Sequence, residues 1–175
     1  MDFIKDLIII IIVAGVGIYV ALSFNFLKLF INSEKEKNKY ALKKTNDSIV
    51  IPLRLQAYER LCLLLERISP SSLIMRVYDS SYSIEQLQEL FLSNIRSEFE
   101  HNLSQQIYIS STAWDLVKNA KEDIISAINN AATQVKDPKD TQRYCSLIFE
   151  MTLENNQSRI NIALEFLKNE IRNTF

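Results

Sequence analysis

The stretch Leu53–Pro70, LRLQAYERLCLLLERISP, decides how the larger part of this chain folds. Its leucines and isoleucine cover most of the circumference of a helix, and a helix that is apolar nearly all round is buried. Pro52 suits the first turn of this helix and Pro70 suits its end, because proline has no backbone N–H to donate. We therefore expect a helix from about 52 to 69 at the centre of a helical domain.

Glycine is the next informative residue type. The 175-residue chain has only two, Gly15 and Gly17, and both precede this domain. A domain without glycine has no Gly-cornered hairpin and no Gly-rich phosphate loop. This composition disfavours a P-loop nucleotidase, a Rossmann domain and a β-sandwich. It favours helices joined by short polar turns.

Two later helices are marked by their first residues. Ser83–Gln86 fits a capping box and begins a helix that reaches about 107. Its stripe of Ile84, Leu87, Phe91, Ile95, Phe99 and Leu103 has helical spacing. Ser111 or Thr112 caps the next helix, whose apolar face includes Trp114.

A last helix follows the turn at 136–140, with Asp140 or Thr141 as its cap, and reaches about 169. Short connections between long helices favour antiparallel neighbours, so the expected fold class is all-α, a bundle of about four helices over 49–175. The polar run Glu154–Ser158 interrupts the last helix. It could be a buried polar layer, a kink or an exposed segment, and we expect the last, with the helix outrunning the bundle.

The second half of that helix then becomes a candidate partner surface, because it would lie outside the bundle. Its candidate contact residues share one helical face or begin it: Arg159, Ile160, Leu164, Leu167 and Ile171.

Leu7–Leu27, LIIIIIVAGVGIYVALSFNFL, has no charged residue and lies between Asp6 and Lys28. As a helix it would measure roughly 31 Å, which matches a bilayer core. The start of the chain lacks the basic region of a signal peptide, so we expect an uncleaved anchor. The expected organisation is a transmembrane helix at 1–30, a charged stalk at 31–48 and the bundle at 49–175.

Lysines follow the apolar run more often than they precede it, which predicts the amino terminus outside and the bundle in the cytoplasm. The expected location is a bacterial inner membrane, with lipid as a partner. Ala14, Gly17 and Ala21 form a small-residue patch that suits a helix–helix contact in lipid. Small residues are also common in any membrane helix.

Few residues suggest chemistry. Glu98–His101 has the Glu-x-x-His spacing of di-iron bundles, but His101 is the only histidine, so we expect no metal and a surface position. Cys62 and Cys145 fall in apolar helical patterns and read as core residues. The sequence predicts neither a cofactor nor a catalytic group, and the net charge of −1 does not suggest nucleic acid.

One basic pattern stays open. Arg54, Arg60 and Arg67 lie along the 52–69 helix and could line a contact for a small anion or a protein. Solvated helix faces often look the same.

The run Leu53–Pro70 and the later AWDLVKNAKE, which contains Trp114, resemble an uncharacterised bacterial family of small helical proteins with an N-terminal membrane segment. The resemblance implies no activity, cofactor or functional residue.

We expect a non-enzymatic, membrane-anchored interaction module or an accessory subunit of an inner-membrane assembly, with a protein partner. The alternative is a self-associating protein that organises structure or lipid. A hydrolase or transferase at the membrane surface is the third hypothesis, and it requires an apolar pocket with converging polar groups.

Overall fold

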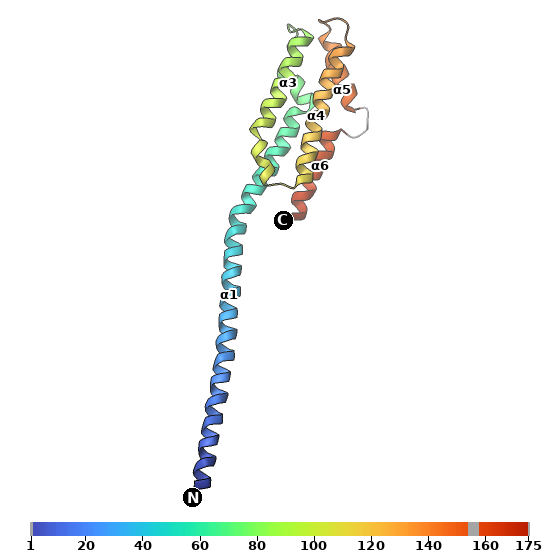
Figure 1. Cartoon of the computed structure of the whole chain (residues 1–175). Coiled ribbons are helices and arrows are strands. Elements are labelled where there is room, and N and C mark those ends of the chain that lie inside the picture. The colour runs from blue at the N-terminus through green and yellow to red at the C-terminus, as the bar shows by residue number, and fades with distance from the viewer. Residues whose placement is uncertain (1, 154–157, 175) are drawn as a thin grey trace. The chain divides into compact units, whose positions relative to one another are not determined.

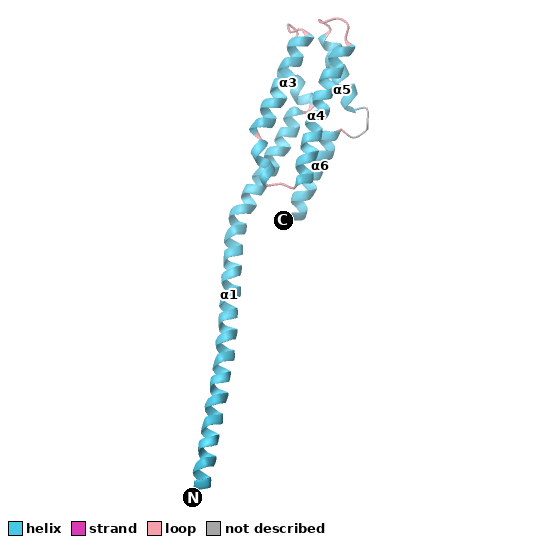
Figure 2. Cartoon of the chain, viewed as in Figure 1, coloured by secondary structure: helices cyan, strands magenta, loops and turns pink. Residues whose placement is uncertain are grey.

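The computed structural model describes residues 2–153 and 158–174, and every regular element among them is helical. The elements are α1 (Asp2–Ile68), α2 (Pro70–Val77), α3 (Ile84–His101), the 3₁₀ turn η1 (Leu103–Ile107), α4 (Ser111–Gln134), α5 (Thr141–Leu153) and α6 (Arg159–Thr174) (Figure 1). Figure 2 shows them joined by short loops. The chain divides into two compact units, Met1–Val50 and Ile51–Phe175.

The structure corrects the prediction of a transmembrane anchor at 1–30. Among the residues that it describes, no helix has both the length and the apolar character needed to cross a bilayer. The prediction rested on Leu7–Leu27, and most side chains of that stretch lie outside the described set. The expected orientation and inner-membrane location depended on the same anchor and are corrected with it. A lipid partner stays an expectation.

The unit from Ile51 onward is a helical bundle with an up–down–up–down path (Figure 1). The end of α1 and α2 run one way, α3 returns, α4 runs parallel to the first helix, and α5 and α6 return together. α4 packs against α3, α5 and α6, while α2 packs against α3 and α5. The expected all-helical bundle is therefore present, with its first and last helices each broken once.

The break in the first helix lies at Ser69 and Pro70. α1 ends at Ile68, as expected, because Pro70 has no N–H with which to continue the helix. Ser69 caps the new helix by accepting a hydrogen bond from the Ser72 amide at 3.4 Å. α2 then carries the chain onward and buries Leu73 in the core.

The last helix is not continuous, contrary to prediction. α5 ends at Leu153 and α6 begins at Arg159, and residues 154–157 lie outside the described set. α6 does not outrun the bundle, because it packs along α4. Its apolar face belongs to the same core as the rest.

The start of the first bundle helix also differs from expectation. We expected this helix to begin near Pro52, but α1 continues through that residue from the preceding segment. Thr45 Oγ1 and Ser48 Oγ donate to carbonyls of their own helix, those of Ala41 and Thr45, at 3.0 and 2.7 Å. Side chains bonded in this way do not compete with the helix as a turn would require.

The core is filled by large side chains from every helix of this unit. Its largest fully buried members include Tyr58, Tyr144 and Phe91, and the last two rings stack at 6.2 Å between centroids. Phe99 stacks on Trp114 at 5.3 Å. α4 contributes four buried alanines, at 113, 120, 127 and 131, which let its three neighbours approach closely.

Helix caps fix where the bundle helices begin. The predicted capping box is confirmed: the Ser83 amide donates to Gln86 Oε1 at 2.9 Å, and the Gln86 amide donates to Ser83 Oγ at 3.3 Å. Asp140 caps α5 through the Arg143 amide, as expected. The cap of α4 is Ser110, immediately before the predicted pair Ser111 and Thr112.

Candidate functional site

A polar groove lies between α1 and α3 in the unit from Ile51 onward. It encloses about 180 Å³ and is lined by Arg60, Leu63, Leu64, Arg67, Glu98, His101 and Asn102. The α1 residues share a face because they recur at helical spacing, and the α3 residues come from its last turn. Leu64 is buried in the core, whereas Leu63 is 55% exposed. The groove therefore has an apolar floor and a charged rim.

The charges in this groove are unevenly paired. Two guanidinium nitrogens of Arg67 donate to Glu98 Oε1, at 2.6 and 2.7 Å. Asn102 donates to the Glu98 carbonyl at 2.8 Å and so closes the end of α3. Arg60 is different, because it has neither a hydrogen bond nor an ion pair with any residue that the structure describes.

The groove is small for a cofactor or a metabolite. Small-molecule pockets usually enclose roughly 300–1,000 Å³. A volume of about 180 Å³ suits one or two side chains of a partner better. Glu98 and His101 both line it, but the structure groups no set of three metal-ligating side chains among its described residues.

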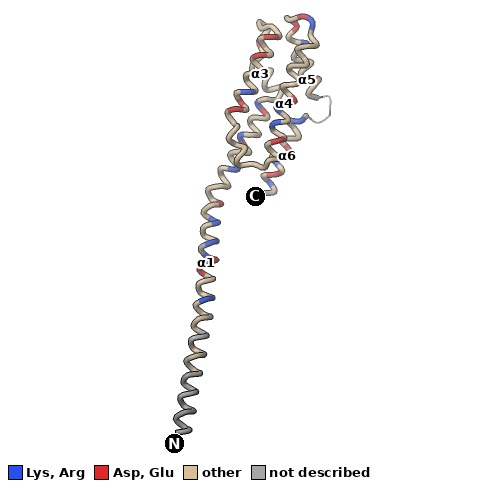
Figure 3. The backbone as a smooth tube through the Cα atoms, viewed as in Figure 1, with Lys and Arg blue, Asp and Glu red and all other residues tan. Residues whose placement is uncertain are grey.

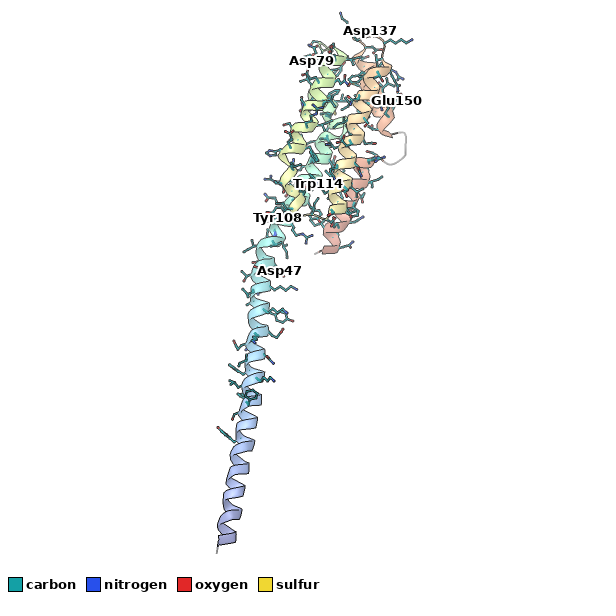
Figure 4. All side chains as sticks on the ribbon, in the orientation of Figure 1. Asp47, Asp79, Tyr108, Trp114, Asp137 and Glu150 are labelled. Carbon is teal, nitrogen blue, oxygen red and sulfur yellow. The ribbon has the colours of Figure 1, made fainter. Side chains whose placement is uncertain are left out.

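A second feature is a group of exposed aliphatic side chains on α1 and η1. The α1 members Ile51, Leu53 and Leu55 are 40%, 41% and 52% exposed, and Ile107 of η1 is 74% exposed. Arg54 Nε donates to the Tyr108 carbonyl at 3.1 Å and ties these two segments together. Figure 4 places Tyr108 at one end of the bundle, with Asp79 and Asp137 at the other. We call Ile51, Leu53, Leu55 and Ile107 the apolar end patch.

A buried phenol lies beside this patch. The Tyr58 side chain is 2% exposed, and burial raises its pKa, as does the Glu170 carboxylate of α6, whereas the Arg54 guanidinium lowers it. Its hydroxyl has no hydrogen bond of ordinary geometry among the described residues. Arg54, Tyr58 and Glu170 thus form a polar cluster that joins the first and last helices.

Both cysteine side chains pack in the core or against it. Cys145 is buried in the core, and burial raises its pKa to about 11. Cys62 is half-buried and packs against the core, and burial raises its pKa more than Lys168 lowers it. Because the thiolate is the nucleophilic form, neither side chain is activated for catalysis.

The predicted C-terminal partner residues lie elsewhere than expected. Ile160, Leu164 and Leu167 are 4%, 5% and 1% exposed and belong to the core. Ile171 is half-buried against it, and Arg159 Nε pairs with Asp123 of α4 at 3.2 Å. In this fold those apolar side chains are already covered by the chain itself.

The predicted small-residue patch falls largely outside the described side chains. Those of Ala14 and Ala21 belong to the undescribed set. Gly17 lies in α1, and a Cβ added there would meet no described atom within 4 Å.

Of the three arginines singled out in the sequence, two meet in the groove. Arg60 and Arg67 line it together, but Arg54 turns instead to the Tyr108 carbonyl. His101 is exposed, as expected. The sequence did not predict the apolar end patch: Leu53 and Leu55 were assigned to a buried helix, and Ile107 to the end of another helix.

Charge elsewhere on the bundle is mixed in sign (Figure 3). Short-range pairs such as Lys118 with Asp115 and Lys168 with Glu165 are exposed and separated by one helical turn. Pairs of this kind contribute little to stability. They mark solvated faces rather than a site.

The chain belongs to a family of unknown function, DUF7935, whose model matches residues 2–174. The resemblance to an uncharacterised family is thereby confirmed, while its bacterial and membrane-anchored description is not part of that match. No curated protein matches the chain, and no solved structure does.

Proposed function

We propose that the unit from Ile51 onward is a non-enzymatic protein-interaction module whose binding surface is the apolar end patch. The observation that carries this is the exposure of Ile51, Leu53, Leu55 and Ile107 on a bundle whose other large aliphatic side chains mostly fill a core. Exposed large aliphatic side chains gathered at one end of a bundle are candidates for a surface that a partner covers.

The location of the patch supports this function. The hydrogen bond from Arg54 to the Tyr108 carbonyl joins the two segments that carry its side chains. Segments that are already joined before binding lose less conformational entropy when a partner binds. The bacterial source implied by the family resemblance stays a prediction.

The test is site-specific photocrosslinking in cells that make the full chain. A photoreactive residue replaces Leu55 or Ile107 in separate variants. The control position is Lys139, an exposed residue of the α4–α5 turn at the other end of the bundle, where Figure 4 shows Asp137. We expect one discrete adduct of constant mass at both patch positions and none at Lys139.

The mass of the adduct separates the possible partners. An adduct with a different protein supports the interaction module directly. An adduct of twice the chain's own mass makes the partner a second copy, which was the alternative hypothesis. Adducts at Lys139 as abundant as those at Leu55, or none at either patch position, would overturn the proposal.

A further inference from the structure

The groove between α1 and α3 holds a cation that the fold does not use. Arg60 and Arg67 are seven residues apart, which is about two turns or 10.5 Å along one face of α1. Glu98 accepts both donated hydrogen bonds from Arg67. Among the described residues Arg60 has no such acceptor, so the groove keeps one unneutralised guanidinium.

An apolar side chain lies between the two arginines. Leu63 follows Arg60 by three residues and precedes Arg67 by four, so all three lie on one face. It is 55% exposed, although it lines the groove. A ligand that fills this groove would meet an aliphatic contact flanked by positive charge.

The rest of the lining adds no further acidic side chain. His101 is exposed at the end of α3 and lines the same groove. The Glu98 carboxylate is the only acidic side chain in the lining, and it is already engaged by Arg67. The arrangement therefore complements an acidic group carried next to an apolar one.

We propose that this groove binds an acidic, amphipathic helical segment of a partner protein, with a carboxylate on Arg60 and an aliphatic side chain against Leu63. The volume of about 180 Å³ accommodates the side chains of such a segment, not a whole ligand. The inference goes beyond the apolar end patch, because it assigns a second surface and the chemistry of the segment that this surface binds. Charge pairs at an interface rim set the rate and selectivity of association.

The probe is a 15-residue, end-capped helical peptide with Leu–Glu pairs at i and i+4 on one face and a fluorophore at its amino terminus. Binding to the full chain is measured by fluorescence anisotropy at low and high salt. Two control peptides replace every Glu by Gln or every Leu by Ala. We expect the original peptide to bind at least about tenfold more tightly than either control, and its affinity to fall with salt.

Variants of the protein locate the site. Arg60→Glu should weaken binding by about tenfold or more, because it replaces an attraction by a repulsion. Arg96→Glu is the matched control: Arg96 is an exposed residue of α3 that does not line the groove, and the net charge changes equally. It should change the affinity less than about twofold, since only distant and screened charge is altered. Leu63→Ser should also weaken binding, with the unfolding transition unchanged.

Three results would overturn the inference. These are equal effects of Arg60→Glu and Arg96→Glu, equal binding of the three peptides, or displacement of the peptide by inorganic phosphate beyond the effect of sodium chloride at the same ionic strength. The last would make the groove a simple anion site. Failure here is distinguishable from failure of the proposed function, because crosslinking at Leu55 does not depend on Arg60.

Discussion

At the scale of single residues, Ser83 shows how one hydroxyl fixes the start of a helix. Its oxygen accepts from the Gln86 amide while Gln86 returns a bond to the Ser83 amide. The next amide, that of Ile84, donates to the Pro138 carbonyl at 3.0 Å. The cap therefore also holds α3 to the turn before α5.

Ser83→Ala should lower the free energy of unfolding by about 1 kcal/mol, because the first turn of α3 loses an acceptor. Urea unfolding followed by circular dichroism measures the change. The control is Ser93→Ala, since Ser93 is exposed within the same helix and bonds only to the Leu90 carbonyl. A loss as large for Ser93 as for Ser83 would remove the special role of the cap.

The thiols give a second prediction at this scale. With its pKa raised to about 11, Cys145 is protonated at pH 8 and should react with iodoacetamide far more slowly in the folded chain than in urea. Mass mapping of alkylated peptides measures both rates. Cys62 is half-buried, so we expect its folded-state rate to lie between that of Cys145 and the rate in urea. Equal rates for Cys145 with and without urea would contradict its burial.

The same shift sets the sign of a stability effect. A thiol whose pKa is raised by folding stabilises the fold fully below its unfolded pKa. That contribution is lost as pH rises from the unfolded value of about 8.5 towards 11. Wild type should therefore lose more stability between pH 8 and pH 10.5 than Cys145→Ala, which lacks the titrating group.

At the scale of elements, the packing of α6 in the core can be tested with one buried and one exposed side chain of that helix. Leu164→Ala should destabilise the fold by about 2–5 kcal/mol, because it removes a side chain that is 5% exposed in the core. Ile162→Ala is the control on the same helix, since Ile162 is 41% exposed, and it should cost under about 0.5 kcal/mol. The difference is read from urea midpoints. Equal losses would mean that α6 does not pack as described.

Features of helices that depend on a few neighbouring residues were predicted from the sequence, whereas features that depend on packing were not. The capping box at Ser83 and the end of α1 before Pro70 follow from bonding within a few residues, and both were predicted. The continuation of α1 through Pro52 and the docking of α6 on α4 depend on other factors. Helical propensity and core burial along a whole segment outweigh one proline or one polar run.

Only part of the candidate site was predicted from the sequence, for the same reason. The spacing of Arg60 and Arg67 placed them on one face, but only the packing of α1 on α3 brings Glu98 to Arg67 and leaves Arg60 unpaired. Arg54 shares their helix, yet it faces Tyr108 instead. Leu164 and Leu167, which we expected on a partner surface, are buried in the core, because an amphipathic stripe does not reveal which element covers it.

At the scale of the whole molecule, the core lies within the unit Ile51–Phe175. Every described residue of that core cluster lies between Tyr58 and Leu167, so among the described side chains the core is built from this unit. The polar cluster of Arg54, Tyr58 and Glu170 also lies within this unit. This predicts that the unit folds by itself.

A fragment of residues 51–175 should therefore unfold cooperatively in urea, with a free energy within about 1 kcal/mol of the value for the bundle transition in the full chain. The matched fragment 70–175 lacks the α1 core residues Leu61, Leu64, Leu65 and Ile68, each at most 1% exposed. The free energy lost with four such buried side chains exceeds the free energy of unfolding of a typical domain. This fragment should therefore show no cooperative transition. If both fragments unfolded alike, the end of α1 would not be part of the core. If neither folded, the bundle would need the first unit, and the groove on α1 would have to be studied only in the full chain.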